Sequence, residues 1–372
     1  MFHTIARINL STLAENMDVV RERLPYGTKV LFAVKSDGYG HGIEAVSRTA
    51  EEAGIDYLGA TTVEEGGEIR AAGVKLPILL LGPILPTEIH TALKLDLTPF
   101  ISDLESARLV ARFARRMKKR ATVQVNVDTG MGRFVVRAER AADFTAQLVK
   151  LDDIKVEGVF SHLSFAEAES PEARAHSLWQ IERFDTVLAA LDEAGVLPPL
   201  RHIGNSAAVI QYLDRVISAP LNMVRIGTML YGYPEVERPW TNALRPIATL
   251  SAQVISLKDL SPGDCVGYDC AYRTTRAQRI AVISIGYGCG LPPSLSNRGK
   301  VWLRGGYAPV VGKVCLDHTI IDVTDVAGVT IGDSVEIFGP DNPADRLADM
   351  ADLSVCQLLV PALRGASVRR YD

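Results

Sequence analysis

A lysine stands at the end of an apolar run near the start of the chain, directly before a glycine-rich segment. Residues 30–34 read Val-Leu-Phe-Ala-Val, Lys35 follows, and residues 36–42 read Ser-Asp-Gly-Tyr-Gly-His-Gly. An apolar environment favours the neutral amine, which can act as a nucleophile or a base. A lone lysine at a strand end usually extends into solvent, but glycines let the backbone approach a ligand closely. The segment therefore favours a lysine that forms a Schiff base with a bound carbonyl compound.

Other polar motifs follow apolar runs further along the chain. Residues 128–133 read Asp-Thr-Gly-Met-Gly-Arg, His162 follows a run that ends at Ser161, residues 202–207 read His-Ile-Gly-Asn-Ser-Ala, and residues 225–228 read Arg-Ile-Gly-Thr. Any one of them alone is weak, because a lone histidine or a Gly-x-Gly turn is more often structural. Because all of these motifs follow apolar runs, together they indicate a functional site more strongly than any one of them does.

The elements that would position these motifs alternate along residues 10–235. We predict strands at eight apolar runs: 30–34, 57–60, 78–81, 97–101, 122–127, 156–161, 200–203 and 223–226. We expect amphipathic helices between them, among others at 43–54, 63–73, 104–116 and 178–195. Strand–helix alternation predicts a parallel sheet, and eight units in this length predict a (β/α)8 TIM barrel, an α/β fold. Because barrel active sites lie at the carboxyl ends of the strands, the polar motifs should meet there.

The pattern changes past Pro239. Helical periodicity gives way to β-branched runs at 248–257, 280–285, 310–314 and 319–323, separated by glycine and proline turns. Such runs predict a mostly β domain. Pro234, Pro239 and Pro246 cluster where the pattern changes, as is typical of a domain boundary. We therefore predict a barrel over residues 1–238 and a C-terminal β domain over residues 239–372.

Composition excludes several classes of partner. The chain has 372 residues, 47% of them hydrophobic, and a net charge of −4, which is ordinary for a soluble protein and gives no sign of nucleic-acid or membrane binding. A basic run lies between Arg112 and Arg120, and we interpret it as a solvated helix face. The start, Met1–Thr4, does not resemble a signal peptide, and no apolar run is long enough to span a bilayer.

The five cysteines are Cys265, Cys270, Cys289, Cys315 and Cys356. Their number is odd and no pair has Cys-x-x-Cys spacing, which argues against a disulfide framework or a metal site. We therefore expect reduced thiols and a cytoplasmic location.

A lysine that forms a Schiff base implies a carbonyl cofactor, for which pyridoxal 5'-phosphate is the usual choice. Its phosphate needs hydrogen-bond donors. The hydroxyls of Ser206 and Tyr39 and the backbone amides of Gly227 and Thr228 suit a phosphate site near the last barrel strands.

Several motifs together resemble one family. Residues 33–42, Ala-Val-Lys-Ser-Asp-Gly-Tyr-Gly-His-Gly, resemble the pyridoxal-phosphate attachment signature of the alanine racemases. The motifs at 128–133, 161–163, 202–207 and 225–232 resemble that family's other barrel motifs, in the same order. Those at 266–272, 285–287 and 312–317 resemble its C-terminal domain.

The resemblance implies a homodimeric racemase that interconverts L- and D-alanine by a two-base mechanism and supplies D-alanine for cell-wall precursors. Lys35 would bind the cofactor and act as one base, and Tyr268 of the other subunit would be the second base. Arg225 would face the pyridine nitrogen, where its charge disfavours ring protonation. The cofactor would also contact Tyr39, Arg133, His162, Asn205, Ser206, Gly227 and Thr228. The substrate would contact Arg133, Tyr287, Leu316 and Asp317.

Four positions depart from the family pattern. Asn126 stands where many members carry a lysine, often carbamylated, that orients the counterpart of Arg133, and an anion such as chloride would replace its charge. Leu316 replaces a methionine, residues 288–290 read Gly-Cys-Gly in place of Ala-Asp-Gly, and Leu363 with Arg364 stands near the place of an entrance tyrosine. Serine or a broader set of amino acids is therefore an alternative substrate.

Three further readings compete with a racemase. A barrel amino-acid decarboxylase usually has a cysteine where Tyr268 stands. A non-catalytic pyridoxal-phosphate carrier is a barrel alone, without the predicted β domain. A purely structural barrel leaves Lys35, Arg133, His162 and Arg225 at one end of the barrel unexplained.

Overall fold

Apolar strands rich in valine, leucine, isoleucine and phenylalanine form the buried centre of one of the two units of this protein. The structure is a computed structural model that describes residues 4–133 and 136–372. We call the units the barrel unit (Leu13–Gly38 and Ile43–Arg245) and the β unit (Met1–Thr12, Tyr39–Gly42 and Pro246–Asp372). Each is described by itself.

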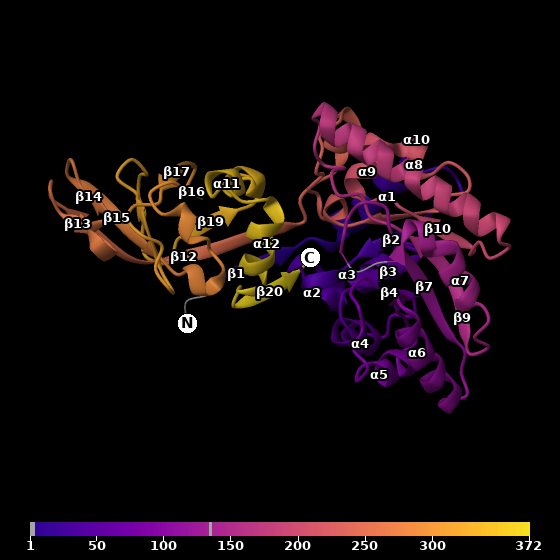
Figure 1. The fold of residues 1–372 in the computed structure, drawn as a ribbon. Helices are drawn as coiled ribbons and strands as arrows, with labels where there is room; N and C mark the ends of the chain where they lie inside the picture. Colours follow the sequence, from indigo (N-terminus) through magenta and orange to yellow (C-terminus); the bar gives the residue numbers. More distant parts are fainter. Residues whose placement is uncertain (1–3, 134–135) are drawn as a thin grey trace. The chain divides into compact units, whose positions relative to one another are not determined.

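The strands of the barrel unit are parallel (Figure 1). All of them except β8 lie where the apolar runs predict strands, and the run at 97–101 forms two short strands, β5 and β6. One sheet has the order β11-β2-β3-β4-β5 and the other the order β10-β9-β7-β6, with β8 beside β7. The strands are β2 (Lys29–Ala33), β3 (Tyr57–Ala60), β4 (Ile78–Leu80), β5 (Leu97–Thr98), β6 (Phe100–Ile101), β7 (Ala121–Asp128), β8 (Val136–Arg137), β9 (Ile154–Phe160), β10 (Leu200–His202) and β11 (Met223–Ile226).

The two sheets join into the predicted barrel at two places. Pro99, which lacks an N–H group to pair, separates β5 from β6 in a single apolar run. On the other side, the Asn222 amide donates to the Arg201 carbonyl at 3.1 Å, and the Arg225 amide donates to the Gly204 carbonyl at 2.9 Å. Side chains from the strands fill the interior with a buried cluster of Leu31, Tyr57, Leu79, Phe100, Phe160, Leu200 and Met223. The expected α/β barrel is confirmed.

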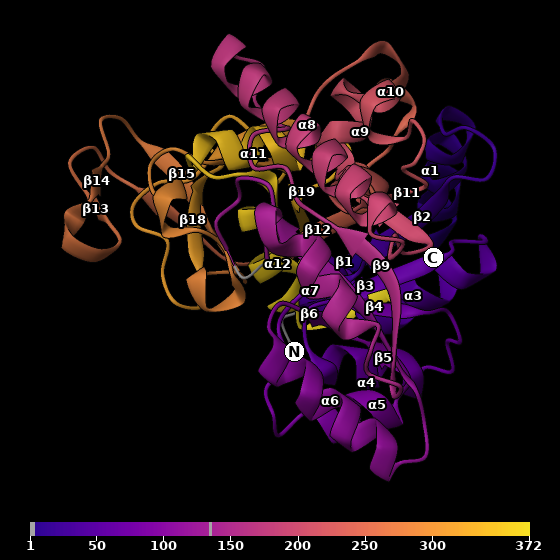
Figure 2. The ribbon, with the colours of Figure 1, turned by 45° about the vertical axis from the view of Figure 1, so that its right-hand side comes forward.

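Helices follow most of these strands, and α6, α7 and α8 can be traced in order in Figure 2. The helices are α1 (Leu10–Arg23), α3 (Ile43–Glu52), α4 (Val63–Ala71), α5 (Ile89–Lys94), α6 (Leu104–Arg116), α7 (Ala141–Leu148), α8 (Pro171–Glu193), α9 (Ser206–Gln211) and α10 (Leu213–Val216). Helix α8 starts earlier than predicted because Ser170 caps it by accepting from the Ala173 amide at 3.2 Å. Arg112, Arg115 and Arg116 are exposed on α6, so the basic run is a solvated face as predicted.

The β unit is built on an eight-stranded sheet with the central order β17-β16-β19-β12-β1-β20, to which β15 and β18 are added. The strands are β1 (Ile5–Ile8), β12 (Ala248–Leu260), β13 (Cys265–Val266), β14 (Tyr272–Arg273), β15 (Gln278–Ile283), β16 (Lys300–Leu303), β17 (Gly306–Pro309), β18 (Thr319–Asp322), β19 (Ser334–Phe338) and β20 (Val368–Tyr371). Two helices, α11 (Ala344–Met350) and α12 (Val355–Arg364), complete it. A mostly β C-terminal part is therefore confirmed.

The first strand lies in the β unit, so the expected division at residue 238 needs a correction. Strand β1 pairs with β12 in antiparallel fashion, with Ile5 opposite Ser251, and with β20 in parallel fashion, with Ile5 opposite Val368. Residues 39–42 also group with this unit. Pairing over more than 200 residues has no local sequence signal, which is why the division missed it. In the part of the chain that the structure describes, no helix is long and apolar enough to cross a membrane.

Candidate active site

The backbone after Lys35 makes a left-handed turn. Element α2 (Lys35–Tyr39) has positive φ angles of 55° at Ser36, 59° at Asp37, 60° at Gly38 and 52° at Tyr39. A left-handed residue with a side chain costs roughly 1–2 kcal/mol, so such strain persists only where the surroundings fix it, often at functional sites. The Gly38 amide donates to the Val34 carbonyl at 2.7 Å, and the Asp37 carboxylate accepts from the Ile43 amide at 2.9 Å. The turn therefore holds half-buried Lys35 at the end of β2.

Glu65 also fixes this turn, and sequence reasoning missed it. Its carboxylate accepts from the Ser36 amide at 2.5 Å and from the Thr61 amide at 2.7 Å. Thr62 and Glu65 form the capping box at the start of α4. The Thr-x-x-Glu pattern predicts such a helix start, but nothing local indicates that the same carboxylate reaches Ser36.

We expect Glu65→Gln to lower the free energy of unfolding by about 1–2 kcal/mol, because the side-chain amide of Gln would turn an N–H donor toward one of the two backbone N–H groups that the carboxylate now accepts from. Exposed Glu64 in the same helical turn is the matched control, and Glu64→Gln should cost no more than about 0.5 kcal/mol. Urea unfolding of both variants measures the difference. Equal losses would mean that Glu65 acts only through its charge at the helix start.

Arg225 is buried at the end of β11 and its guanidinium makes several hydrogen bonds. It is 7% exposed. It donates to the Ser161 carbonyl at 2.7 Å, to His162 Nδ1 at 3.0 Å and to His202 Nδ1 at 3.0 Å. Burial, and then the charge of Arg133, lower the pKa of Arg225 to about 9. The group therefore still carries its proton at neutral pH.

His162 is neutral and lies among three cations. Burial, and then the charges of Arg225, Arg133 and Lys35 in that order, lower the pKa of His162 to about 3. Lys35, Arg133 and Arg225 come from the ends of different strands, as the barrel prediction requires. A neutral ring beside three cations is complementary to an anionic ligand.

The Asp128 side chain shapes the turn that carries Arg133. It accepts from the Gly130 amide at 2.8 Å and from the Gly132 amide at 3.1 Å. Partial burial alone would raise the pKa of Asp128, but these amides lower it below its usual range. Asn126, where the family pattern has a lysine, is buried in β7.

The predicted phosphate donors follow β10 and β11. The Ser206 hydroxyl accepts from the Gly227 amide at 2.9 Å, which leaves its own proton for an anion. The Thr228 hydroxyl donates to the Glu235 carboxylate in this structure. Asn205 accepts from the Ala208 amide at 3.0 Å and thereby caps α9, so its contact here is structural. The Gly227 amide, which we predicted to donate to a phosphate, therefore donates to Ser206 in this structure. The Ser206 hydroxyl proton and the three cations together fit a phosphorylated cofactor.

The other predicted site residues lie in the β unit. Tyr268 is 67% exposed, Tyr287 49% and Leu316 51%, and Asp317 is exposed too. The Tyr287 amide donates to the Cys315 carbonyl at 2.9 Å, which brings Tyr287 beside the segment that carries Leu316 and Asp317. Tyr39 also belongs to this unit.

Leu363, near the place where the family pattern has an entrance tyrosine, packs close to the glycine-rich segment. Leu363 is buried in α12, and a Cβ on Gly40 would lie 3.0 Å from its Cβ atom. A tyrosine does reach the glycine-rich segment from the C-terminal strand, because a Cβ on Gly42 would collide with the hydroxyl of Tyr371. Sequence reasoning passed over Tyr371.

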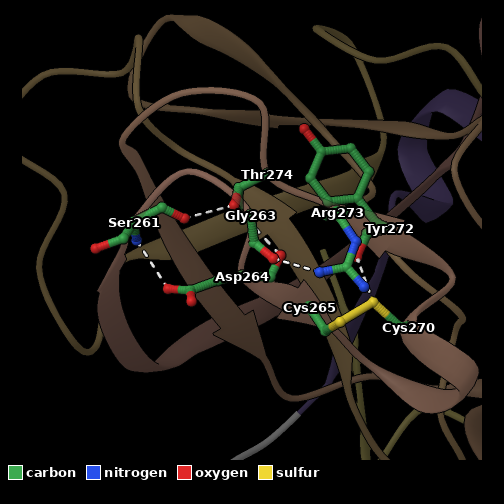
Figure 3. The surroundings of a disulfide bond; sticks show 8 residues. All are labelled: Ser261, Gly263, Asp264, Cys265, Cys270, Tyr272, Arg273 and Thr274. Carbon is green, nitrogen blue, oxygen red and sulfur yellow. Dashed lines mark hydrogen bonds between the residues drawn. A yellow bond between two sulfur atoms is a disulfide. The ribbon is translucent and has the colours of Figure 1, made fainter.

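A disulfide bond joins Cys265 to Cys270 and closes the loop that carries Tyr268 (Figure 3). The prediction of reduced thiols is wrong for this pair. Strands β13 and β14 form a hairpin, with Cys265 opposite Arg273, and residues 267, 269 and 270 have positive φ angles of 71°, 57° and 47°. This sharply bent loop brings the two cysteines together. Asp269 within it pairs with Lys313 at 2.5 Å.

The chain is similar to known proteins over nearly its whole length. The family model for the alanine racemase N-terminal domain matches residues 8–235, and the C-terminal domain model matches residues 247–370. Alanine racemase from Halothermothrix orenii is 37% identical, covering 94% of this chain and 92% of its own. The enzyme from Desulfovibrio desulfuricans is also 37% identical, covering 98% and 96%.

Solved structures share the fold. Alanine racemase from Clostridium difficile 630 superposes with a TM-score of 0.91 at 29% identity, covering 100% of this chain and 97% of that one. Alanine racemase from Bartonella henselae with covalently bound pyridoxal phosphate superposes with a TM-score of 0.87 at 24% identity, covering 100% and 99%.

Proposed function

The chain belongs to the alanine racemase family and is a pyridoxal-phosphate-dependent racemase of alanine, and from this premise we propose that Lys35 and Tyr268 are its two bases. The observation that supports the barrel half of the site most strongly is the gathering of Lys35, Arg133 and Arg225 around neutral His162. Chiral analysis of alanine and the other chiral proteinogenic amino acids after incubation with enzyme and pyridoxal phosphate tests the activity. Alanine that keeps its configuration would refute it.

Each of the cofactor-binding residues has a different role. Lys35 would bind pyridoxal phosphate covalently, the Ser206 hydroxyl and the Thr228 amide would hold its phosphate, and Arg225 would face its ring nitrogen. Gly227 would act through its amide, which orients the Ser206 hydroxyl. Pyridoxal phosphate, when bound, withdraws electrons from an attached amino acid and so makes its α-proton easier to remove. Arg225 keeps a fixed positive charge there, which opposes protonation of the ring. Arg133 binds on the side of the phenolic oxygen and the substrate.

Racemisation needs a proton removed on one face of the α-carbon and delivered on the other. Two bases, one beside each face, can do this without reorientation of the substrate. We assign the D-alanine face to the Lys35 amine and the L-alanine face to the Tyr268 hydroxyl. Tyr287, Leu316 and Asp317 bind the substrate beside Tyr268.

We propose that the active enzyme is a homodimer whose sites are shared. The support is the exposure of Tyr268, Tyr287 and Leu316 on the β unit, since clustered exposed apolar side chains commonly mark an interface. The partner's barrel would cover them.

Mixing two inactive variants tests the shared site. After subunit exchange, Lys35→Ala and Tyr268→Phe should form heterodimers in which one of the two sites has both bases, so up to half of the wild-type activity per heterodimer returns. Chiral chromatography measures activity, and mass spectrometry of labelled subunits confirms exchange. Confirmed exchange without recovery would place both bases in one subunit.

The substrate range follows from the entrance residues. We expect alanine to be the best substrate, with measurable turnover of serine, because a change of about one methylene in a pocket alters discrimination by only about 1–3 kcal/mol. The ratio of kcat/KM for the two amino acids measures this. Turnover of alanine alone would indicate that another side chain, such as Tyr371 beside Gly42, narrows the entrance.

A cytoplasmic location and a role in supplying D-alanine for the cell wall stay proposals based on the family. A disulfide such as Cys265–Cys270 is uncommon in that compartment. Trapping free thiols in living cells before lysis would establish its state there.

A further inference from the structure

A chain of hydrogen bonds leads from Arg225 into the interior of the barrel. His202, which accepts from Arg225 through Nδ1, contacts Gln124 Oε1 through Nε2 at 2.9 Å. Gln124 Nε2 donates to Glu157 at 3.4 Å, and the Tyr57 hydroxyl donates to the other oxygen of Glu157 at 3.1 Å. His202 and Gln124 are each 0% exposed. The chain thus connects the Arg225 guanidinium to a carboxylate through two fully buried groups.

The chemistry of the end groups fixes the direction of every bond. A guanidinium can only donate, so His202 Nδ1 must accept and Nε2 must carry the ring proton. Gln124 must then accept through its oxygen, which turns its NH2 group toward Glu157. Burial, and then the charge of Arg225, lower the pKa of His202, so the ring stays neutral. Phe160 stacks on the ring at 5.0 Å, which fixes its plane but not which nitrogen faces Arg225.

The backbone makes room for this chain of hydrogen bonds at two points. Opposite β7, strand β9 has a bulge at which Val156 pairs with Val123 and Gly158 with Gln124, so Glu157 is the extra residue. Bulges re-aim a side chain and are common next to active sites. At Gly158, a Cβ would lie 2.8 Å from Gln124 Cδ and 2.9 Å from Gln124 Oε1. Glycine there leaves the space that the Gln124 amide occupies.

Tyr57 and Glu157 form the end of the hydrogen-bond chain that is farthest from Arg225. Burial, and then the charge of Glu157, raise the pKa of Tyr57, so Tyr57 keeps its proton and remains a donor. Glu157 also lines a cavity of about 210 Å³ together with Lys119 and Arg120.

We propose that Gln124, Glu157 and Gly158 are positioning residues that hold His202 in its neutral Nε2–H form and thereby aim the Arg225 guanidinium at the ring nitrogen of the cofactor. The proposal rests on the assignment of Arg225 to that nitrogen. A purely structural interior would be filled by apolar side chains, as barrel cores usually are. A buried polar chain is stable only when every member is satisfied, and here a bulge and a glycine accommodate it.

Two substitutions disturb this chain of hydrogen bonds and leave Arg225 and His202 themselves unchanged. Gln124→Leu removes the acceptor for His202 Nε2, and Gly158→Ala pushes the Gln124 amide out of place. The control is Asn16→Leu, which removes another buried amide of the same unit, one that donates to the Leu230 carbonyl at 3.0 Å and to the Arg245 carbonyl at 2.8 Å. All three variants should have a lower free energy of unfolding than the wild type, so a loss of stability does not distinguish a positioning role from a structural one.

The deciding measurement uses cofactor-free protein. Nitrogen-15 histidine spectra, with the His202 signal identified by its absence in His202→Asn, should show one neutral ring protonated at Nε2 in the wild type and in Asn16→Leu. In Gln124→Leu and Gly158→Ala this signal should shift or divide between tautomers. An unchanged His202 signal in folded Gln124→Leu, or the same change in Asn16→Leu, would overturn the proposal. This readout needs no racemase activity, so it stays interpretable if the proposed bases are wrong.

The loaded enzyme gives the second readout. In Gln124→Leu and Gly158→Ala, kcat for alanine should fall about 10- to 100-fold, as for small displacements of a catalytic group, while KM changes little. Asn16→Leu should keep the wild-type kcat at temperatures where it is folded. A change confined to KM would show that the chain serves substrate binding instead and would contradict the proposal.

Discussion

Lys35→Ala should lower the rate of alanine racemisation by at least about 10⁴-fold, the upper range for removal of a positioned base. The loss is expected to be this large because the same amine both binds the cofactor covalently and moves a proton. Chiral chromatography of D-alanine formed from L-alanine measures it. Borohydride reduction of the wild type should also fix the cofactor on the peptide that contains Lys35.

Lys29 gives the matched control for this variant. It lies at the opposite end of the same strand β2, where its ammonium group is 3.8 Å from the Asp56 carboxylate. Lys29→Ala should leave the activity within about threefold of wild type, since a surface ion pair contributes only about 0–1 kcal/mol. Labelling of a lysine other than Lys35 would contradict the assignment.

Tyr268→Phe should separate the two directions of the reaction. The substitution removes only the hydroxyl, so exchange of the L-alanine α-proton with deuterium should fall by about 10²- to 10⁴-fold. Exchange from D-alanine should fall much less, because the Lys35 amine serves that face. Proton NMR in deuterium oxide follows both exchanges separately.

Tyr307 controls for the loss of an exposed tyrosine hydroxyl in the same unit. It lies in β17, is exposed, and its hydroxyl donates to the Asp341 carbonyl at 3.0 Å. Tyr307→Phe should leave both exchange rates unchanged. Equal suppression of the two exchanges in Tyr268→Phe would show that Tyr268 is not specific to one face.

Local patterns in the sequence were sufficient to predict the barrel strands and the ends at which polar residues gather. Strand β2 ends at Ala33 and β11 at Ile226, within one residue of the predicted ends, because each is a short apolar run bounded by glycine or polar residues. The gathering of Lys35, Arg133, His162 and Arg225 followed from one rule about barrels, that strand ends share a face.

Non-local pairing explains what the sequence could not reveal. Glu157 falls in a strand-like run, and its bulge depends on the register with β7 rather than on its neighbours in sequence. The left-handed turn has little local signal, since Ser36 does not favour positive φ and an aspartate such as Asp37 adopts it mostly as a single residue, not within a run of four. Cys265 and Cys270 meet only because a five-residue loop between β13 and β14 bends sharply.

The place of β1 has a consequence for synthesis on the ribosome. Ile8 of β1 pairs with Ala248 of β12, and β20 then covers the other edge of β1. At roughly 5–20 residues per second, β1 leaves the ribosome about 10–50 s before its first partner exists. During that time the barrel sequence can fold, but Ala6 and Ile8 have no sheet to join. Both side chains are fully buried in the folded protein. Strand β1 therefore stays unpaired until the C-terminal part of the chain has been made, and a variant lacking β1 should leave the edges of β12 and β20 unpaired and the β unit open to proteases.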